Sequence, residues 1–305
     1  MKVIVTGATG LIGSAISRVN ASHEIIPLTR KSVDLLDFNA TLDFLAANPA
    51  DALIHAAALV GGIGGNSLRS AQYFHDNILM NTNVLEAARL SGIENLVTFM
   101  STCIFPVDSS YPLTVEQLHQ GEPHPSNFGY AFAKRMLDVQ VRAYNLQWGT
   151  NYKILIPTNV YGPNDNFSLL EGHVLPALIH KLFLASREGD DFVVWGSGQP
   201  LREFVYSEDI ARVSLRALER ELNGPVIVTS EKETSIKDVS LLLAEILGFE
   251  REIVFDTSRP EGQFRKPSSA EEMKIHFPNT EFTELEEGLR KTVDWFVSRF
   301  PKVRM

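Results

Sequence analysis

The 305-residue chain has one cysteine, Cys103, and no long run of apolar residues. A single cysteine excludes an intramolecular disulfide, which is typical of a reducing compartment. No segment is long enough to span a bilayer, and the amino-terminal MKVIVTG lacks the pattern of a secretory signal. Basic residues are outnumbered by acidic ones, and the net charge of -9 disfavours a nucleic-acid partner. We therefore expect a soluble, cytoplasmic protein that binds neither membrane nor nucleic acid.

The first half of the chain alternates short apolar runs with longer amphipathic segments. The runs, typical of buried strands, are KVIVT, EIIPL, ALIHAA, LVTFMS and KILIPT. Helical patterns lie between them, near residues 11–20, 38–47, 67–91 and 128–148. Such alternation predicts a doubly wound α/β fold of the Rossmann type, with a parallel sheet covered by helices on both faces.

The second half departs from this alternation. A helical pattern in GHVLPALIHKLFLA precedes two strand-like runs around GSGQP. Further helical patterns lie near residues 207–222, 235–247 and 284–299. We therefore expect two unequal units with approximate boundaries. The first is a dinucleotide-binding domain in 1–165 with return segments around 200–230, and the second is a smaller, discontinuous substrate-binding lobe in 166–199 and 231–305.

The segment VTGATGLIG places Gly7, Gly10 and Gly13 between the first predicted strand and the first predicted helix. Glycines there permit a tight turn and let the backbone approach a pyrophosphate, which binds to N–H groups at the positive end of the helix. The G-x-x-G-x-x-G spacing is one residue wider than the common dinucleotide fingerprint, and a plain turn is the alternative. The position between a strand and a helix favours the dinucleotide site.

Arg30 and Lys31 follow the second predicted strand. NAD-binding proteins usually carry an acidic residue there, which holds the ribose 2′-hydroxyl. A carboxylate would repel a 2′-phosphate, whereas a guanidinium binds it with charge-assisted hydrogen bonds. Exposed loop cations are the alternative. We predict that the cofactor is NADPH or NADP+.

Tyr130 is followed four residues later by Lys134, in a predicted helix that Ser126 or Asn127 would cap. The two residues share an inward face. A tyrosine above a lysine is either a packing residue or a proton donor, and the cation would lower the pKa of the phenol towards neutrality. Ser101 ends the run LVTFMS, where open parallel sheets bind ligands, and its hydroxyl would reach the same substrate oxygen.

The glycine turn, the strand-end serine and the Tyr-x-x-x-Lys pair resemble the short-chain dehydrogenase/reductase family. The length and the second lobe resemble its extended, nucleotide-sugar-modifying branch. The resemblance implies that Tyr130 is the catalytic acid and that Ser101 is the third member of the triad. It also implies that Lys134 supports the tyrosine electrostatically and anchors the nicotinamide ribose.

Further stretches resemble the GDP-L-fucose synthase family within that branch. They are HAAALVGGIGGN (55–66), STCIFP (101–106), IPTNVYGPNDNF (156–167), VVWGSGQPLREFVYSEDIA (193–211) and FDTSRPEGQFRKP (255–267). That family epimerises C3 and C5 of GDP-4-keto-6-deoxy-D-mannose and then reduces the C4 ketone with NADPH. The resemblance implies that Cys103 is the base and His173 the acid of the epimerisation. The residues alone do not fix this direction, and inert packing for Cys103 or a helix cap for His173 are the alternatives.

The same resemblance implies the contacts of cofactor and substrate. Besides the glycine turn, Arg30 and the Tyr–Lys pair, the cofactor would contact Thr9, Leu11, Ile12, Ala57, Pro157, Asn159, Val160 and His173. The GDP-sugar would contact Ser101, Cys103, Asn159, Val174, Lys181, Trp195, Arg202, Arg265 and Lys266. The chain departs from some family members at Thr9, where they carry a basic residue. No metal is expected, and for any one cation a solvated surface charge is the alternative.

Two other functions remain open. A redox-neutral, NAD-dependent sugar-nucleotide epimerase or dehydratase would use the same fold, but Arg30 disfavours NAD, and STCIFP lacks the acidic residue of such dehydratases. A silent NADP-binding regulator is disfavoured by the intact Ser101, Tyr130 and Lys134. The helices near 67–91 and 128–148 carry more apolar residues than one buried face needs. Because the extended branch commonly pairs these helices across a twofold axis, we expect a homodimer.

Overall fold

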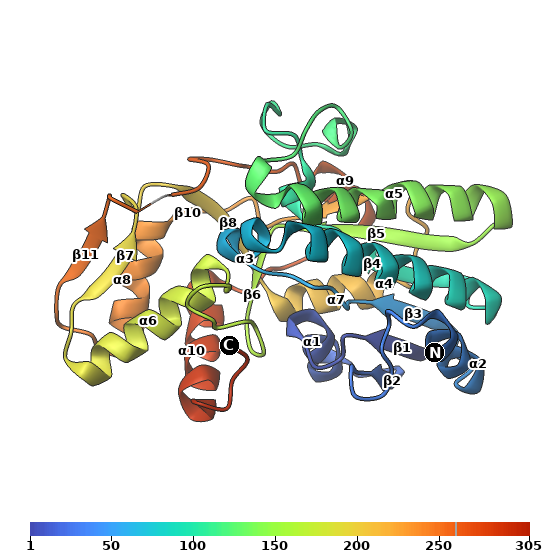
Figure 1. The fold of residues 1–305 in the computed structure, drawn as a ribbon, viewed down its shortest axis with the longest axis horizontal. Coiled ribbons are helices and arrows are strands. Elements are labelled where there is room, and N and C mark those ends of the chain that lie inside the picture. Colours follow the sequence, from blue (N-terminus) through green and yellow to red (C-terminus); the bar gives the residue numbers. More distant parts are fainter. Residues whose placement is uncertain (260) are drawn as a thin grey trace.

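Figure 1 shows the computed structural model, which describes residues 1–259 and 261–305, the side chains of residues 63, 64 and 67 excepted. Its larger unit is built on a parallel sheet with the strand order β2-β1-β3-β4-β5-β9. The strands are β1 (Lys2–Thr6), β2 (Glu24–Leu28), β3 (Ala52–His55), β4 (Asn95–Phe99), β5 (Asn151–Pro157) and β9 (Val226–Val228). The chain leaves β1 towards β2 on one side and returns to β3 on the other. The carboxyl edge of β1 therefore lies at the switch point where open sheets bind ligands.

Two layers of helices cover this sheet, as the strand–helix alternation predicts. One layer contains α2 (Phe38–Ala47), α4 (Ser70–Leu90) and α5 (Phe128–Trp148). The other contains α1 (Leu11–Val19), α7 (Ser207–Ala217) and α9 (Glu271–His276). In Figure 1, α4 and α5 run side by side along the larger unit.

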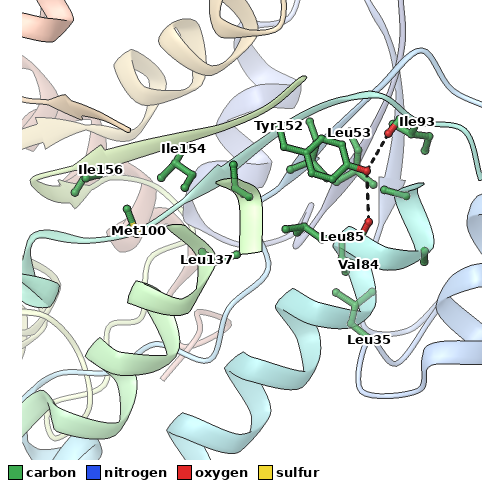
Figure 2. Close-up of a cluster of buried hydrophobic side chains, with 14 of the residues drawn as sticks. Leu35, Leu53, Val84, Leu85, Ile93, Met100, Leu137, Tyr152, Ile154 and Ile156 are labelled. Carbon is green, nitrogen blue, oxygen red and sulfur yellow. Dashed lines mark hydrogen bonds between the residues drawn. The ribbon is translucent and has the colours of Figure 1, made fainter. Parts of the chain in front are cut away.

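The core under α4 and α5 contains the hydroxyl of a tyrosine among aliphatic side chains. Figure 2 shows Tyr152 of β5 among Leu53, Leu85 and other aliphatic side chains. Its hydroxyl donates towards the carbonyl oxygens of Ile93, at 3.1 Å, and of Leu85, at 3.4 Å. A buried tyrosine needs such partners, and these tie α4 and the turn before β4 to β5.

The smaller unit has two short sheets and its own core, seen on the left in Figure 1. One sheet contains β6 (Asn159–Tyr161), β8 (Leu201–Tyr206) and β10 (Glu233–Ser235), and the other contains β7 (Phe192–Trp195) and β11 (Ile253–Asp256). The helices α6 (Val174–Glu188), α8 (Ile236–Leu247) and α10 (Leu285–Arg299) pack around an aromatic-rich core.

The predicted fold class is confirmed, and three details differ from the sequence analysis. The predicted helix over 67–91 is divided at Arg69, whose φ of -128° is not helical, into α3 (Ile63–Leu68) and α4. The strand β9 was not expected, because three residues are too few to show a period. Residues 270–277 pack onto the core of the larger unit, so the chain crosses between units inside the segment assigned to the lobe.

Two further properties concern the whole described part of the chain. None of its helices combines the length and the apolar character that a membrane crossing requires. No group of three or more His, Cys, Asp or Glu side chains in these residues is placed to hold a metal ion.

Candidate active site

The glycine turn joins β1 to α1 at the carboxyl edge of the sheet. Gly7 has a φ of 64°, and a Cβ on it would lie 2.8 Å from the backbone of Ala57. A Cβ on Gly13 would lie 2.2 Å from the Gly7 carbonyl oxygen. The helix then begins at Leu11 with no side chain capping its first N–H groups. Bare backbone next to open N–H groups fits the pyrophosphate of a dinucleotide.

Arg30 lies close to this turn. The Ala8 N–H donates to the Leu28 carbonyl at 3.3 Å, which places the end of β2 beside the glycines. Arg30 follows two residues later and is exposed. An exposed guanidinium next to a dinucleotide cradle fits a ribose 2′-phosphate.

The end of β4 brings a hydroxyl and a thiol together. The Met100 N–H donates to the Leu155 carbonyl at 2.9 Å, which pins this strand end to β5. Ser101 keeps an extended backbone, and the chain then turns through the short helix Thr102–Ile104. The Ser101 side chain lies next to the Cys103 thiol and favours its ionised form through hydrogen bonding. The hydroxyl of Ser101 and the thiol of Cys103 are therefore neighbours.

Lys134 points from α5 to this strand end. Its Nζ donates a hydrogen bond to the Phe99 carbonyl at 3.0 Å, and the side chain is buried. Burial lowers the pKa of Lys134 from 10.5 to about 8, and the nearby Cys103 opposes that shift. The lysine is fixed by backbone at the same strand end that carries the serine and the thiol.

Tyr130 lies one helical turn before Lys134 and is 6% exposed. Burial raises its pKa well above the ordinary value, and Cys103 and Tyr73 contribute. The expectation that this pKa is lowered towards neutrality is wrong, because desolvation of the phenolate dominates. Tyr130 therefore keeps its proton at neutral pH, which suits a proton donor.

The pKa of the Cys103 thiol is also raised. Burial raises its pKa, whereas Ser101, Lys266 and Lys134 lower it and offset part of the rise. The net shift of the Cys103 pKa is upward because the thiol is desolvated. Three neighbours that favour the thiolate are nevertheless more than a packing cysteine requires.

His173 immediately precedes α6, and its side chain does not cap that helix. It is exposed, yet it has enough protein around it that desolvation lowers its pKa, with a smaller effect from Arg304. No hydrogen bond or ion pair within the described residues joins His173 to Cys103 or Tyr130, so their meeting around a ligand stays a prediction.

The glycine-rich segment at Gly61 and Gly62 contacts both Tyr73 and the loop before α6. A Cβ on Gly61 would lie 2.3 Å from the hydroxyl oxygen of Tyr73, so the glycine makes room for that ring. The Gly62 N–H donates to the Glu171 carbonyl at 2.7 Å. Tyr73 in turn is close enough to Tyr130 to raise its pKa. The loop before α6 is therefore joined to the Tyr130 side of the site.

Trp195 provides an aromatic surface in the smaller unit. It ends β7 and is 43% exposed. Lys181 Nζ lies 4.2 Å from the centroid of its ring, and Arg259 Cζ lies 5.4 Å from it. An exposed indole with two cations against it suits a ligand that carries both a planar ring and negative charge.

The three remaining cations predicted to bind substrate, Arg202, Arg265 and Lys266, do not share one environment. Arg265 makes a forked pair with Glu233, with contacts of 2.6 to 3.0 Å. Lys266 lies instead near Cys103 and Arg202. The structure therefore places Arg202 near Lys266, whereas Arg265 is engaged by a carboxylate.

The other predicted contacts lie on β5, β6 and α6. Pro157 ends β5, and Asn159 and Val160 begin β6. The Asn159 side-chain amide donates to the Glu203 carbonyl at 2.8 Å, which orients it. Val174 is exposed at the first position of α6.

Sequence reasoning missed two buried groups behind the site. His55 lies between Thr6 Oγ1, at 2.8 Å, and Asn81 Oδ1, at 3.1 Å. Burial and the charge of Lys134 lower its pKa to about 3, so it stays neutral. A histidine inside the apolar run ALIHAA was a signal for it. Tyr73 gave no such signal, because its contact with the glycines is visible only in three dimensions.

A serine at a strand end and a Tyr-x-x-x-Lys helix against it, on a Rossmann sheet, define the extended short-chain dehydrogenase/reductase class. The model of the NAD dependent epimerase/dehydratase family matches residues 3–228. The chain is 38% identical to the GDP-L-fucose synthase of Dictyostelium discoideum, over 99% of this chain and 97% of that protein. It is 33% identical to the GDP-L-fucose synthase of Escherichia coli K12, over 99% and 98%.

The solved structures agree with the sequence relatives. A GDP-L-fucose synthetase from Naegleria fowleri, bound to NADP, matches with a TM-score of 0.92 and 36% identity, covering 100% of this chain and 96% of that one. The chain belongs to the NAD dependent epimerase/dehydratase family and, within it, to the GDP-L-fucose synthases.

Proposed function

We propose that this chain converts GDP-4-keto-6-deoxy-D-mannose to GDP-L-fucose, by inverting C3 and C5 and then reducing the C4 ketone with NADPH. The observation that carries the proposal is the Cys103 thiol next to Ser101, Tyr130 and Lys134. Reduction of a ketone needs no thiol. A base beside hydroxyls that hold the ketone oxygen suits removal of a proton from the neighbouring carbon.

The epimerisation uses the acidity that the C4 ketone gives to the protons on C3 and C5. The Cys103 thiolate takes such a proton, and the electron pair of the C–H bond moves onto the C4 oxygen. The hydroxyls of Ser101 and Tyr130 stabilise that oxygen. We assign the return of a proton from the opposite face to the imidazolium form of His173, because the lowered pKa makes that cation a stronger acid.

The reduction uses the same oxygen-binding groups. NADPH, held by the glycine turn and Arg30, would supply a hydride to C4. Tyr130 donates its proton to the C4 oxygen, and Lys134 stabilises the phenolate that remains. Since the protein around Tyr130 disfavours the phenolate before the reaction, the proton is retained until the C4 oxygen becomes basic. One site that stabilises an oxyanion therefore serves both reactions.

NADPH consumption separates this function from the redox-neutral alternative. We expect one equivalent of NADPH to be oxidised for each equivalent of GDP-4-keto-6-deoxy-D-mannose, followed by the absorbance at 340 nm. The product should elute with authentic GDP-L-fucose. A product formed without net NADPH oxidation would instead identify a redox-neutral enzyme.

The cofactor assignment predicts a specific loss in Arg30→Ser. Hydrogen bonds to charged groups contribute about 1.5–3 kcal/mol, so NADPH binding should weaken about 10- to 100-fold. NADH has no 2′-phosphate, and its affinity should change little. Fluorescence titration with both nucleotides measures the two effects, with Lys31→Ser as the neighbouring control. An equal loss for NADPH and NADH would contradict the role of Arg30.

We also propose that two copies pair through α4 and α5, in the cytoplasm that the single cysteine suggests. Phe74, Phe128, Phe132 and Met136 line an apolar hollow at this face. Phe74, Phe128 and Met136 are 43%, 53% and 39% exposed. Large apolar side chains clustered on one face are typical of an interface between subunits.

Met136→Glu tests this pairing. A carboxylate buried in an apolar interface costs several kcal/mol unless it is paired, so the variant should sediment as a monomer where the wild type is a dimer. Val297→Glu is the matched control, because Val297 lies on α10 and is 42% exposed. A wild-type protein that is monomeric at about 10⁻⁵ M, above the Kd expected of a stable interface, would refute the pairing.

A further inference from the structure

The larger unit is bonded to the loop before α6 through Glu171. The Gly62 N–H donates to the Glu171 carbonyl oxygen at 2.7 Å. Beside it, Arg69 Nη2 donates to Glu171 Oε1 at 2.6 Å. Glu171 is therefore held through both its main chain and its side chain, two residues before His173.

On the side of the larger unit, the main chain at this contact is fixed by Asn66. The buried Asn66 amide donates to the carbonyl oxygens of Gly61, at 2.6 Å, and of Gly62, at 3.1 Å. Arg69 stands at the interruption between α3 and α4, and its N–H donates to the Gly65 carbonyl oxygen at 3.1 Å. Both partners of Glu171 thus belong to a well-bonded part of the larger unit.

The loop between this contact and His173 is a compact turn. The Glu171 N–H donates to Ser168 Oγ at 3.2 Å, and the Gly172 N–H donates to the Ser168 carbonyl oxygen at 2.9 Å. His173 follows directly, and its own carbonyl oxygen accepts a hydrogen bond from Ala177 at the start of α6. A shift of Glu171 relative to the larger unit therefore shifts His173 as well.

Gly62 sets how closely the loop approaches the larger unit. A Cβ on Gly62 would lie 2.6 Å from the Gly172 carbonyl oxygen. The φ of -68° and ψ of -176° at Gly62 are open to any residue. The glycine is therefore required by the close contact with the loop and not by its backbone conformation.

We propose that Glu171, held by Arg69 and by the main chain of Gly62, is a positioning residue for His173 in the epimerisation. The inference rests on the proposed function, in which Cys103 and His173 act on opposite faces of the sugar. The base belongs to the larger unit and the acid to the smaller one, so their separation depends on contacts between the units. When His173 returns the proton, an imidazolium N–H bond breaks, a C–H bond forms, and the enolate electrons restore the ketone.

Inversion and proton exchange respond differently to a misplaced acid. With NADP+ in place of NADPH there is no hydride, so GDP-4-keto-6-deoxy-D-mannose in D2O either exchanges or inverts. Cys103 alone can return a solvent deuteron to the face that lost the proton, which gives exchange without inversion. The ratio of the initial rates of inversion and exchange, measured by NMR, therefore reports the position of His173. A general loss of folded protein lowers both rates and leaves their ratio unchanged.

Three variants change the contact in different ways. Gly62→Ala should lower the ratio about 10- to 100-fold, because its Cβ displaces the loop. The Arg69 and Glu171 side chains are 41% and 43% exposed. Arg69→Glu should therefore lower the ratio only about two- to fivefold, as expected for a partly exposed ion pair. Arg69→Glu combined with Glu171→Arg restores the pair with its charges exchanged and should recover most of the ratio.

Arg290→Glu is the matched control. Arg290 pairs with Glu286 at 2.7 Å on the surface of α10, and its side chain is 48% exposed. The same charge reversal there should leave the ratio as in the wild type. The proposal is overturned if Arg69→Glu and Arg290→Glu give the same ratio, or if the charge-exchanged double variant is as impaired as Arg69→Glu.

His173→Gln distinguishes failure of this inference from failure of the proposed function. It should lower the ratio at least as much as Gly62→Ala, because the amide has no acidic proton to return. If the wild type neither exchanges nor inverts the substrate, the proposed function is wrong. If His173→Gln lowers the ratio and Arg69→Glu does not, the proposed function stands and the inference is wrong.

Discussion

Cys103→Ser is expected to lower the exchange of the C3 and C5 protons by about 10²- to 10⁴-fold, the range typical of a lost general base. The serine hydroxyl fills the same space, but its pKa lies far above that of a thiol, so almost no alkoxide forms at neutral pH. NADPH binding should be unchanged, because the glycine turn and Arg30 are untouched. Deuterium incorporation from D2O, measured by mass spectrometry of the sugar nucleotide, gives the rate.

The pH dependence of the wild type supplies a second reading of the same residue. Burial raises the pKa of Cys103 above its ordinary value of about 8.5. The thiolate is the active form, so the exchange rate should rise as pH increases through neutrality. At lower pH the thiol is protonated, and the rate should fall. A Cys103→Ser enzyme with full exchange, or a wild type whose exchange is fastest at acidic pH, would contradict the assignment.

Tyr130→Phe is expected to impair chiefly the reduction, lowering NADPH oxidation by about 10²- to 10⁴-fold. The phenol holds its proton because burial raises its pKa, and the phenylalanine has no proton to give to the C4 oxygen. Proton exchange at C3 and C5 should fall less, because the Ser101 hydroxyl still stabilises the enolate oxygen. Stopped-flow absorbance at 340 nm and deuterium incorporation, measured on the same variant, separate the two steps.

A matched control for this variant lies on the same helix. Tyr144 of α5 donates its hydroxyl to Glu86 at 2.8 Å, away from the strand-end serine. Tyr144→Phe should retain both activities. Equal losses of reduction and exchange in Tyr130→Phe would mean that the phenol does not act as a separate proton donor.

The fold could be predicted because its strands are short apolar runs separated by helical periods, as in KVIVT and the helix that follows it. The shorter elements and the helix break could not be predicted in this way. The three residues of β9 are too few to show a pattern. Ala270 and Met273 pack against the sheet because of the path that the folded chain takes before them, which no local pattern indicates. Arg69 interrupts a helix within a segment that has a continuous helical pattern.

The candidate site likewise has features that the sequence predicts and features that it does not. Ser101, Tyr130 and Lys134 could be placed because each follows from a position on a predicted strand or helix. The directions of the pKa shifts of Tyr130 and Cys103 could not, because they depend on desolvation by residues from several elements.

The central claim is that a single pocket performs both the epimerisation and the reduction. The most direct test incubates the protein with NADPH and GDP-4-keto-6-deoxy-D-mannose in D2O and locates the deuterium by NMR. The account predicts a fucose-configured product with deuterium at C3 and C5, protium from NADPH at C4 and one equivalent of NADPH oxidised. A reduced product that keeps the starting configuration and carries no deuterium at C3 or C5 would contradict it.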